Sequence, residues 1–234
     1  MRTLAVVSRK GGTGKTTIAT HLAVAAGMKG LRTLLIDLDP QKSAQAWFEA
    51  RSALGSAFAE KPTVETCALE NLFSKWMEAR REGYDLMVID TRPTVEADIV
   101  ESIRSADVCL MVVRPSHFDL KAVAETANLT RLLRKKSLVL INQAAPRRNG
   151  FEPEAVLEAY EELRNYGCPV LPVGVRNRLI FQQSARYGLT ANELDPKGYA
   201  ANEIDAAWRE VEKVLWAERT YAGAESPGRS ATLV

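Results

Sequence analysis

Short runs of apolar residues alternate along this chain with longer stretches in which apolar residues recur every three or four positions. The short runs have the length of strands, and the longer stretches have the periodicity of amphipathic helices. The predicted strands cover residues 4–7, 33–38, 85–89, 107–113, 138–141 and 169–173. The predicted helices cover residues 16–27, 44–51, 69–81, 119–135, 153–166 and 199–220.

The order of these elements predicts a doubly wound α/β fold, in which a mostly parallel sheet is flanked by helices. Residues 108–113 are apolar throughout, as expected for a parallel strand buried on both faces. Residues 52–66 show no period, and we expect an irregular connection there. At 234 residues and 46% hydrophobic content, the chain is most simply one domain over residues 1–221. The composition of residues 222–234 predicts a disordered tail.

A glycine-rich segment, Ser-Arg-Lys-Gly-Gly-Thr-Gly-Lys-Thr-Thr over residues 8–17, links the first predicted strand to the first predicted helix. Glycines let the backbone point several N–H groups at a phosphate, and the helix N-terminus favours the bound negative charge. Lys15 is placed to reach the β and γ phosphates, and the Thr16 hydroxyl to bind Mg²⁺. The segment predicts a phosphate-binding loop, against the alternative of a glycine turn with two solvated lysines.

Carboxylates follow two of the predicted strands. Asp37 and Asp39 come at the end of the second strand, and Asp90 comes at the end of the third. Ligands of open α/β sheets bind at the carboxyl ends of the strands, so we expect these side chains beside the glycine-rich loop. A simple turn before Pro40 would explain Asp39 but not Asp37.

The loop departs from the general pattern G-x-x-x-x-G-K-S/T, because Arg9 stands at the first glycine position and Lys10 precedes the glycines. In this it resembles the deviant Walker A motif of the ParA/MinD family of ATPases, in the short form without an N-terminal helix-turn-helix. The resemblance covers about residues 1–220 and includes the acidic motifs around Asp39 and Asp90. It implies a P-loop NTPase fold, ATP and Mg²⁺ as cofactors, and hydrolysis of ATP to ADP and phosphate.

The resemblance also implies roles for single residues. Lys10 would cross a dimer interface to the partner's nucleotide, and Lys15 and Asp39 would complete the catalytic set, with Asp39 orienting the attacking water. The expected Mg²⁺ residues are Thr16, Asp37 and Asp90. The expected nucleotide contacts are Lys10, Gly11, Gly12, Thr13, Gly14, Lys15, Thr16, Thr17, Asn142 and Arg176. Asn142 would pair with the adenine edge, since an amide offers both a donor and an acceptor.

By the same resemblance the chain would bind MgATP, close into a homodimer and hold DNA non-specifically until hydrolysis releases it. A ParB-type partner would stimulate hydrolysis, and the cycle would partition or position plasmid or chromosomal DNA. The expected DNA contacts are Arg176, Arg178, Arg186 and Lys197. The alternative is that these are ordinary solvated basic residues.

The charge and composition of the chain limit the kind of DNA site, the state of the cysteines and the compartment that we expect. The net charge is only +2, so a DNA site has to be a local patch. The three cysteines form no C-x-x-C pair, and we expect reduced thiols. The sequence has no signal segment and no run of membrane-spanning length, which predicts a cytoplasmic protein that is nucleoid-associated when bound to ATP.

Other functions of related proteins stay open. A ParA-like ATPase can instead position a protein or conjugation cargo, because the surfaces that select a cargo leave no motif. A MinD-like membrane-associated ATPase would end in a basic amphipathic helix, whereas the predicted helix 199–220 has mixed charge, so no membrane contact is expected. Iron–sulfur relatives need cysteines that meet across a dimer axis, and Cys109 lies in an apolar run. A metabolic P-loop ligase would not require Lys10.

Overall fold

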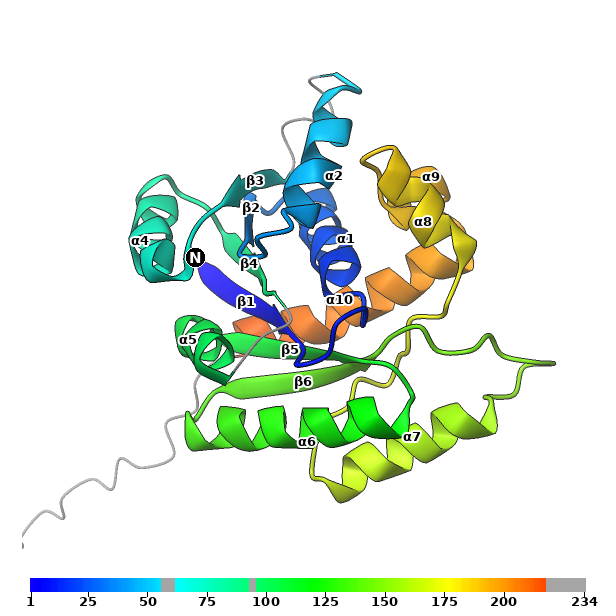
Figure 1. The fold of residues 1–234 in the computed structure, drawn as a ribbon. Helices are drawn as coiled ribbons and strands as arrows, with labels where there is room; N and C mark the ends of the chain where they lie inside the picture. Colours follow the sequence, from blue (N-terminus) through cyan, green and yellow to red (C-terminus); the bar gives the residue numbers. More distant parts are fainter. Residues whose placement is uncertain (56–61, 93–95, 218–234) are drawn as a thin grey trace, which may run out of the picture.

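The computed structural model describes residues 1–55, 62–92 and 96–217, so the predicted tail at 222–234 lies outside the described residues. Within them, parallel strands form one six-stranded sheet in the order β3-β2-β4-β1-β5-β6 (Figure 1). The strands are β1 (Arg2–Val7), β2 (Thr33–Asp37), β3 (Thr63–Thr66), β4 (Leu86–Asp90), β5 (Val108–Val113) and β6 (Lys136–Ile141). The expectation of a mostly parallel, doubly wound sheet is confirmed.

Helices cover both faces of this sheet (Figure 1). They are α1 (Lys15–Met28), α2 (Ser43–Ser52), the 3-10 turn η1 (Leu69–Asn71), α4 (Leu72–Arg81), α5 (Glu96–Ser105), α6 (His117–Leu132), α7 (Glu154–Asn165), α8 (Leu179–Arg186), α9 (Ala191–Leu194) and α10 (Tyr199–Trp216). One core joins the sheet to α1, α2 and α10, and the other joins it to α4, α5, α6 and α7. Side chains of β1 alternate between them, with Leu4 and Val6 in the first core and Ala5 and Val7 in the second. None of the described helices is both long and apolar enough to cross a bilayer.

Some of the described elements lie in stretches where the apolar pattern led us to predict no element, among them β3 and α5. Residues 52–66, expected to be irregular, include the edge strand β3, whose four residues carry one buried side chain, Val64. So short and polar a strand produces no recognisable period. Helix α5 occupies residues 96–105, for which the sequence analysis predicts no element.

The strand predicted at residues 169–173 is wrong. The segment runs beside β6 but makes a single isolated parallel bridge, between Val139 and Val170. Pro169 has no N–H to donate to β6, and after the Leu171 N–H the next bond to β6 comes from the Val175 N–H, so the ladder is not regular along this edge.

Helix α2 is fixed to the segment between α8 and α9. The Arg51 guanidinium, 3% exposed, donates to the Gly188 carbonyl at 3.0 Å and pairs with the Glu193 carboxylate at 2.7 Å. The Trp47 indole donates to the Leu189 carbonyl at 3.0 Å. Gly188 has a φ of 67°, and a Cβ there would lie 2.1 Å from the Arg51 backbone nitrogen, so this contact requires glycine.

A buried histidine joins α1 to α9. The His21 ring is 1% exposed and bridges two backbone groups, with Nδ1–H donating to the Thr17 carbonyl at 2.7 Å and Nε2 accepting from the Ala191 N–H at 2.9 Å. One nitrogen donates and the other accepts, so the ring has to be neutral. Burial lowers the pKa of His21 to about 4.

We expect this histidine to make folding sensitive to acid. The pKa is about 4 in the folded chain and about 6.5 in the unfolded chain, so the unfolded state binds the extra proton and stability falls as the pH drops between these values. Between pH 7 and pH 5, protonation of His21 in the unfolded state lowers the free energy of unfolding by about 2 kcal/mol. Urea unfolding at both pH values measures it. The variant His21→Gln, which does not titrate there, should show a smaller loss, and equal losses in both proteins would contradict this assignment.

Candidate functional site

The glycine-rich loop connects β1 to α1 at the carboxyl edge of the sheet. Gly12 and Gly14 have φ values of 72° and 88°, in the left-handed region that glycine adopts without strain. A Cβ on Gly14 would also lie 2.3 Å from the Asn142 amide nitrogen. Position 14 therefore requires glycine both for its backbone conformation and for the close approach of a neighbouring side chain.

Lys15 begins α1 and is almost fully buried, with 6% of its surface exposed. Burial lowers the pKa of its ammonium group, while the negative charges of Asp90 and Asp39 oppose the shift. A cation held at a helix N-terminus beneath a glycine loop is suited to bind an anion such as a phosphate chain.

Asp90 ends β4 and is fully buried. Neither of its carboxylate oxygens has a hydrogen-bond partner in normal geometry within the described residues, although the Thr16 hydroxyl is close enough to favour the ionised form. Burial raises the pKa of Asp90 to about 7, and the neighbouring negative charges of Asp37 and Asp39 add to the shift. A buried carboxylate without partners fits a site that a divalent cation would neutralise.

A metal ion at this site would need ligands in addition to the protein side chains. The described ranges contain no group of three or more His, Cys, Asp or Glu side chains that could hold a metal ion. Mg²⁺ commonly takes one or two protein oxygens and completes its shell with waters and substrate phosphates. Thr16 and Asp90 fit that role beside the loop.

Asp37 pairs in register with Asp90 across β2 and β4. Its carboxylate accepts hydrogen bonds from the backbone N–H groups of Asp39 at 2.9 Å, Ala44 at 2.9 Å and Gln45 at 3.1 Å. Asp37 therefore holds the N-terminus of α2 and fixes the start of the segment that carries Asp39. Its expected support of Mg²⁺ stays a prediction.

Asp39 and Lys10 are less enclosed than Lys15. The Asp39 side chain is half-buried and accepts from the Gln41 N–H at 2.9 Å. Lys10 is exposed at the tip of the loop, where its backbone N–H donates to the Ser8 hydroxyl at 3.3 Å. The expected roles of Asp39 in catalysis and of Lys10 across a dimer interface stay predictions.

Asn142 lies directly against the loop. Its side-chain amide donates to the Thr13 carbonyl at 2.7 Å, and the residue is 5% exposed. This hydrogen bond holds Asn142 against the phosphate loop. Its expected contact with adenine stays a prediction. Its neighbour Gln143 makes a similar bond to the Gly12 carbonyl at 2.8 Å, and no pattern in the sequence pointed to it.

The four residues expected to contact DNA have different surroundings. Arg176 is 5% exposed, and its guanidinium pairs with Glu152 at 2.5 Å and donates to the Ala145 carbonyl at 3.0 Å, so it is the least accessible of the four. The contacts expected of Arg176 with nucleotide and with DNA stay predictions. Arg178 is half-buried and pairs with Glu203 at 2.6 Å. Arg186 and Lys197 are exposed, and a DNA contact stays a prediction for them.

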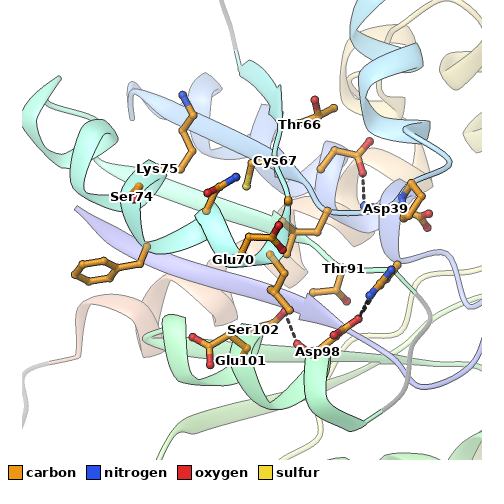
Figure 2. A pocket seen from close by; sticks show the side chains of 18 of the residues that line it. Asp39, Thr66, Cys67, Glu70, Ser74, Lys75, Thr91, Asp98, Glu101 and Ser102 are labelled. Carbon is orange, nitrogen blue, oxygen red and sulfur yellow. Dashed lines mark hydrogen bonds and ion pairs between the residues drawn. The ribbon is translucent and has the colours of Figure 1, made fainter.

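A cavity of about 1040 Å³ opens beside the Asp39 segment, between α4 and α5 (Figure 2). Its labelled lining residues are Asp39, Thr66, Cys67, Glu70, Ser74, Lys75, Thr91, Asp98, Glu101 and Ser102. Lys75 pairs with Glu78 at 2.6 Å, and Arg92 pairs with Asp98. These residues come from separate segments, so no local sequence pattern predicts the cavity.

Comparisons with known proteins agree with this geometry. Residues 4–191 match the family described as the CobQ/CobB/MinD/ParA nucleotide binding domain. Maintenance of carboxysome distribution protein A from Gloeobacter kilaueensis is 35% identical over 219 residues, covering 92% of this chain and 94% of that protein. Sporulation initiation inhibitor protein Soj from Bacillus subtilis is 24% identical over 166 residues, covering 56% of this chain and 66% of that protein.

Solved structures share the fold. Apo McdA from Cyanthece aligns with a TM-score of 0.72 at 16% identity, covering 92% of this chain and 99% of that chain. The septum site-determining protein MinD from Pyrococcus horikoshii, complexed with Mg-ADP, aligns with a TM-score of 0.70 at 18% identity, covering 91% of this chain and 96% of that chain.

The family match contains the whole phosphate loop together with Asp37, Asp39 and Asp90. The predicted resemblance to ParA and MinD proteins is confirmed, as is the prediction of an ATPase. The family model describes a nucleotide binding domain, and the MinD structure from Pyrococcus horikoshii is itself a complex with Mg-ADP. The chain belongs to the CobQ/CobB/MinD/ParA nucleotide-binding family and is an ATPase of the ParA/MinD type.

Proposed function

We propose that this chain is a positioning ATPase that dimerises on MgATP, holds DNA non-specifically and distributes a protein assembly in the cytoplasm. The observation that carries the choice of cargo is the 35% identity, over almost the full length, to a carboxysome distribution protein. Partition of plasmid or chromosomal DNA with a ParB-type partner is the second candidate, supported by a shorter match, 29% identical over 147 residues, to the chromosome-partitioning ATPase Soj of Thermus thermophilus.

The chemistry assigned to this chain is mainly neutralisation of charge. Lys15 would bind the phosphate chain, and Thr16 and Asp90 would hold Mg²⁺, which supplies further positive charge at the phosphates. Asp39 would orient the attacking water from the segment that Asp37 anchors. The buried carboxylate of Asp90, which lies close to Thr16 and Lys15 and lacks a hydrogen bond of normal geometry, supports this assignment.

The switch in oligomeric state is assigned to Lys10. This side chain is exposed while Lys15 is buried, so the two lysines of the loop have separate surroundings. An exposed ammonium group at the tip of the loop is available to a nucleotide held by a second copy of the chain.

The DNA surface is assigned to α8 and the segment that follows it. Arg186 and Lys197 are its exposed cations, and Arg178 is a further candidate if its pair with Glu203 opens. Because the net charge of the chain is only +2, contact with DNA would depend on this local patch and on two copies acting together.

A membrane-bound MinD-like role has less support. The apolar side of α10 is packed on the sheet, with Ile204, Trp208 and Val211 fully buried. The described part of this helix therefore has no free apolar face to insert into a lipid surface.

We expect Asp39→Ala to bind ATP and to lose turnover by about 100-fold, because water would no longer be oriented in the transition state. Phosphate release measures turnover, and equilibrium binding of a fluorescent ATP analogue measures affinity. Glu158→Ala, at an exposed position on α7, is the control. Unchanged turnover in Asp39→Ala would remove this residue from catalysis.

We expect Lys10→Ala to bind ATP as a monomer, because the charge that bridges two copies is gone. Light scattering of the protein in MgATP measures its mass, with Lys29→Ala as the control at another exposed lysine. Lys15→Ala should instead lose ATP binding altogether. A stable Lys10→Ala dimer in MgATP would contradict the proposed switch.

We expect DNA binding to require ATP and to weaken steeply with salt. The double variant Arg186→Glu/Lys197→Glu should bind DNA at least about tenfold more weakly and reduce the log–log salt slope by about 2. Lys121→Glu/Arg164→Glu makes the same charge change on α6 and α7, on the opposite face of the sheet, and should bind DNA normally. Equal DNA affinities of the two double variants would exclude the α8 surface as the DNA-binding site.

A further inference from the structure

Two consecutive side-chain amides at the end of β6 hold two consecutive carbonyls of the phosphate loop. Asn142 Nδ2 donates to the Thr13 carbonyl at 2.7 Å, and Gln143 Nε2 donates to the Gly12 carbonyl at 2.8 Å. The opposite amide orientation would place oxygen against oxygen, so both nitrogens have to face the loop.

The backbone that carries these amides is itself anchored. The Asn142 N–H donates to the Val113 carbonyl at 2.7 Å, and the Ala144 N–H donates to the Val175 carbonyl at 3.1 Å. Between them Gln143 has a φ of 54°, a left-handed conformation that is uncommon for a residue with a side chain. The local backbone strain is therefore maintained by bonds on both sides, and it aims the Gln143 side chain at the loop.

The phosphate loop needs such partners. A cradle that points its N–H groups at phosphates turns carbonyl groups away from them, and these carbonyls require donors of their own. Gly12 and Gly14 provide the left-handed turns, with φ values of 72° and 88°. The loop and the amides touch directly, since a Cβ on Gly14 would lie 2.3 Å from Asn142 Nδ2.

We propose that Asn142 and Gln143 form an amide clamp that presets the phosphate loop for a polyphosphate chain. They are positioning residues, acting through the carbonyls of Thr13 and Gly12. The clamp concerns nucleotide binding at this loop and not DNA or cargo. A test of the clamp can therefore succeed or fail independently of the proposed positioning function.

The test separates the phosphate chain from the base. Gln143→Gly removes the amide while keeping the left-handed backbone free of strain. The probes are MgATP and magnesium tripolyphosphate, which has no base, with affinities measured by calorimetry. Losing one hydrogen bond that orders the loop should weaken both ligands by the same factor, about three- to tenfold. In steady-state hydrolysis, KM should rise by a similar factor while kcat changes little.

Asn149→Gly is the matched control, because Asn149 is an exposed amide residue that also has a positive φ, of 49°. It should bind both probes normally. Gln143→Glu should bind both more weakly than Gln143→Gly, since a carboxylate would face the Gly12 carbonyl, whereas a residue that only fills space would tolerate this change. The melting midpoint without ligand shows whether Gln143→Gly folds. If it does not fold, Gln143→Asn takes its place. Its side chain is one methylene shorter and would not reach the Gly12 carbonyl, so it should lose the same affinity for both probes.

Two results would overturn the clamp. Weaker binding of MgATP with unchanged binding of tripolyphosphate would mean that Gln143 acts on the base. Unchanged binding of both probes would mean that the loop is preset without it.

Discussion

The structure depends on two opposite charges that are buried in its interior and that the surrounding protein groups do not fully compensate. Lys15 and Asp90 are both buried, and burial lowers the pKa of the first and raises the pKa of the second. Charges in such surroundings are costly unless a ligand compensates them. The sheet, the glycine loop and the start of α1 bring the two charges together, so the fold itself forms a site whose charges a phosphate chain and a divalent cation would compensate.

The surrounding contacts connect this pair to more distant surfaces. The Asp37 carboxylate holds the N-terminus of α2, and Arg51 near the end of the same helix is bonded to Gly188 and Glu193. The Asp39 segment is thus joined through one short helix to α8 and α9. The exposed Arg186 ends α8, so the candidate DNA surface and the candidate catalytic segment lie at opposite ends of one chain of contacts.

Much of the site could be predicted because its motifs are local. The glycine loop, Lys15 and the carboxylates at the strand ends are short patterns with direct physical reasons, and the parallel sheet brings strand ends to one edge. The edge strand β3 was missed because a short half-exposed strand leaves a weak period. Helix α5 was also missed, although Ile99 and Ile103 recur at helical spacing on its buried side. The strand expected at 169–173 failed because Pro169 has no N–H to donate to β6 and the bonding to β6 resumes only at Val175.

By itself, then, the sequence determined the inner strands of the sheet, the loop and the identity of the buried charges, because strand length, helical period and glycine placement act over a few residues. Only the tertiary structure decided which polar groups face each other. It paired Arg176 with Glu152, placed His21 under α9, and brought Gln143 to Gly12 across 131 positions of the chain. Such pairs depend on distances of about 3 Å between segments that the fold brings together, and no periodicity along the chain encodes them.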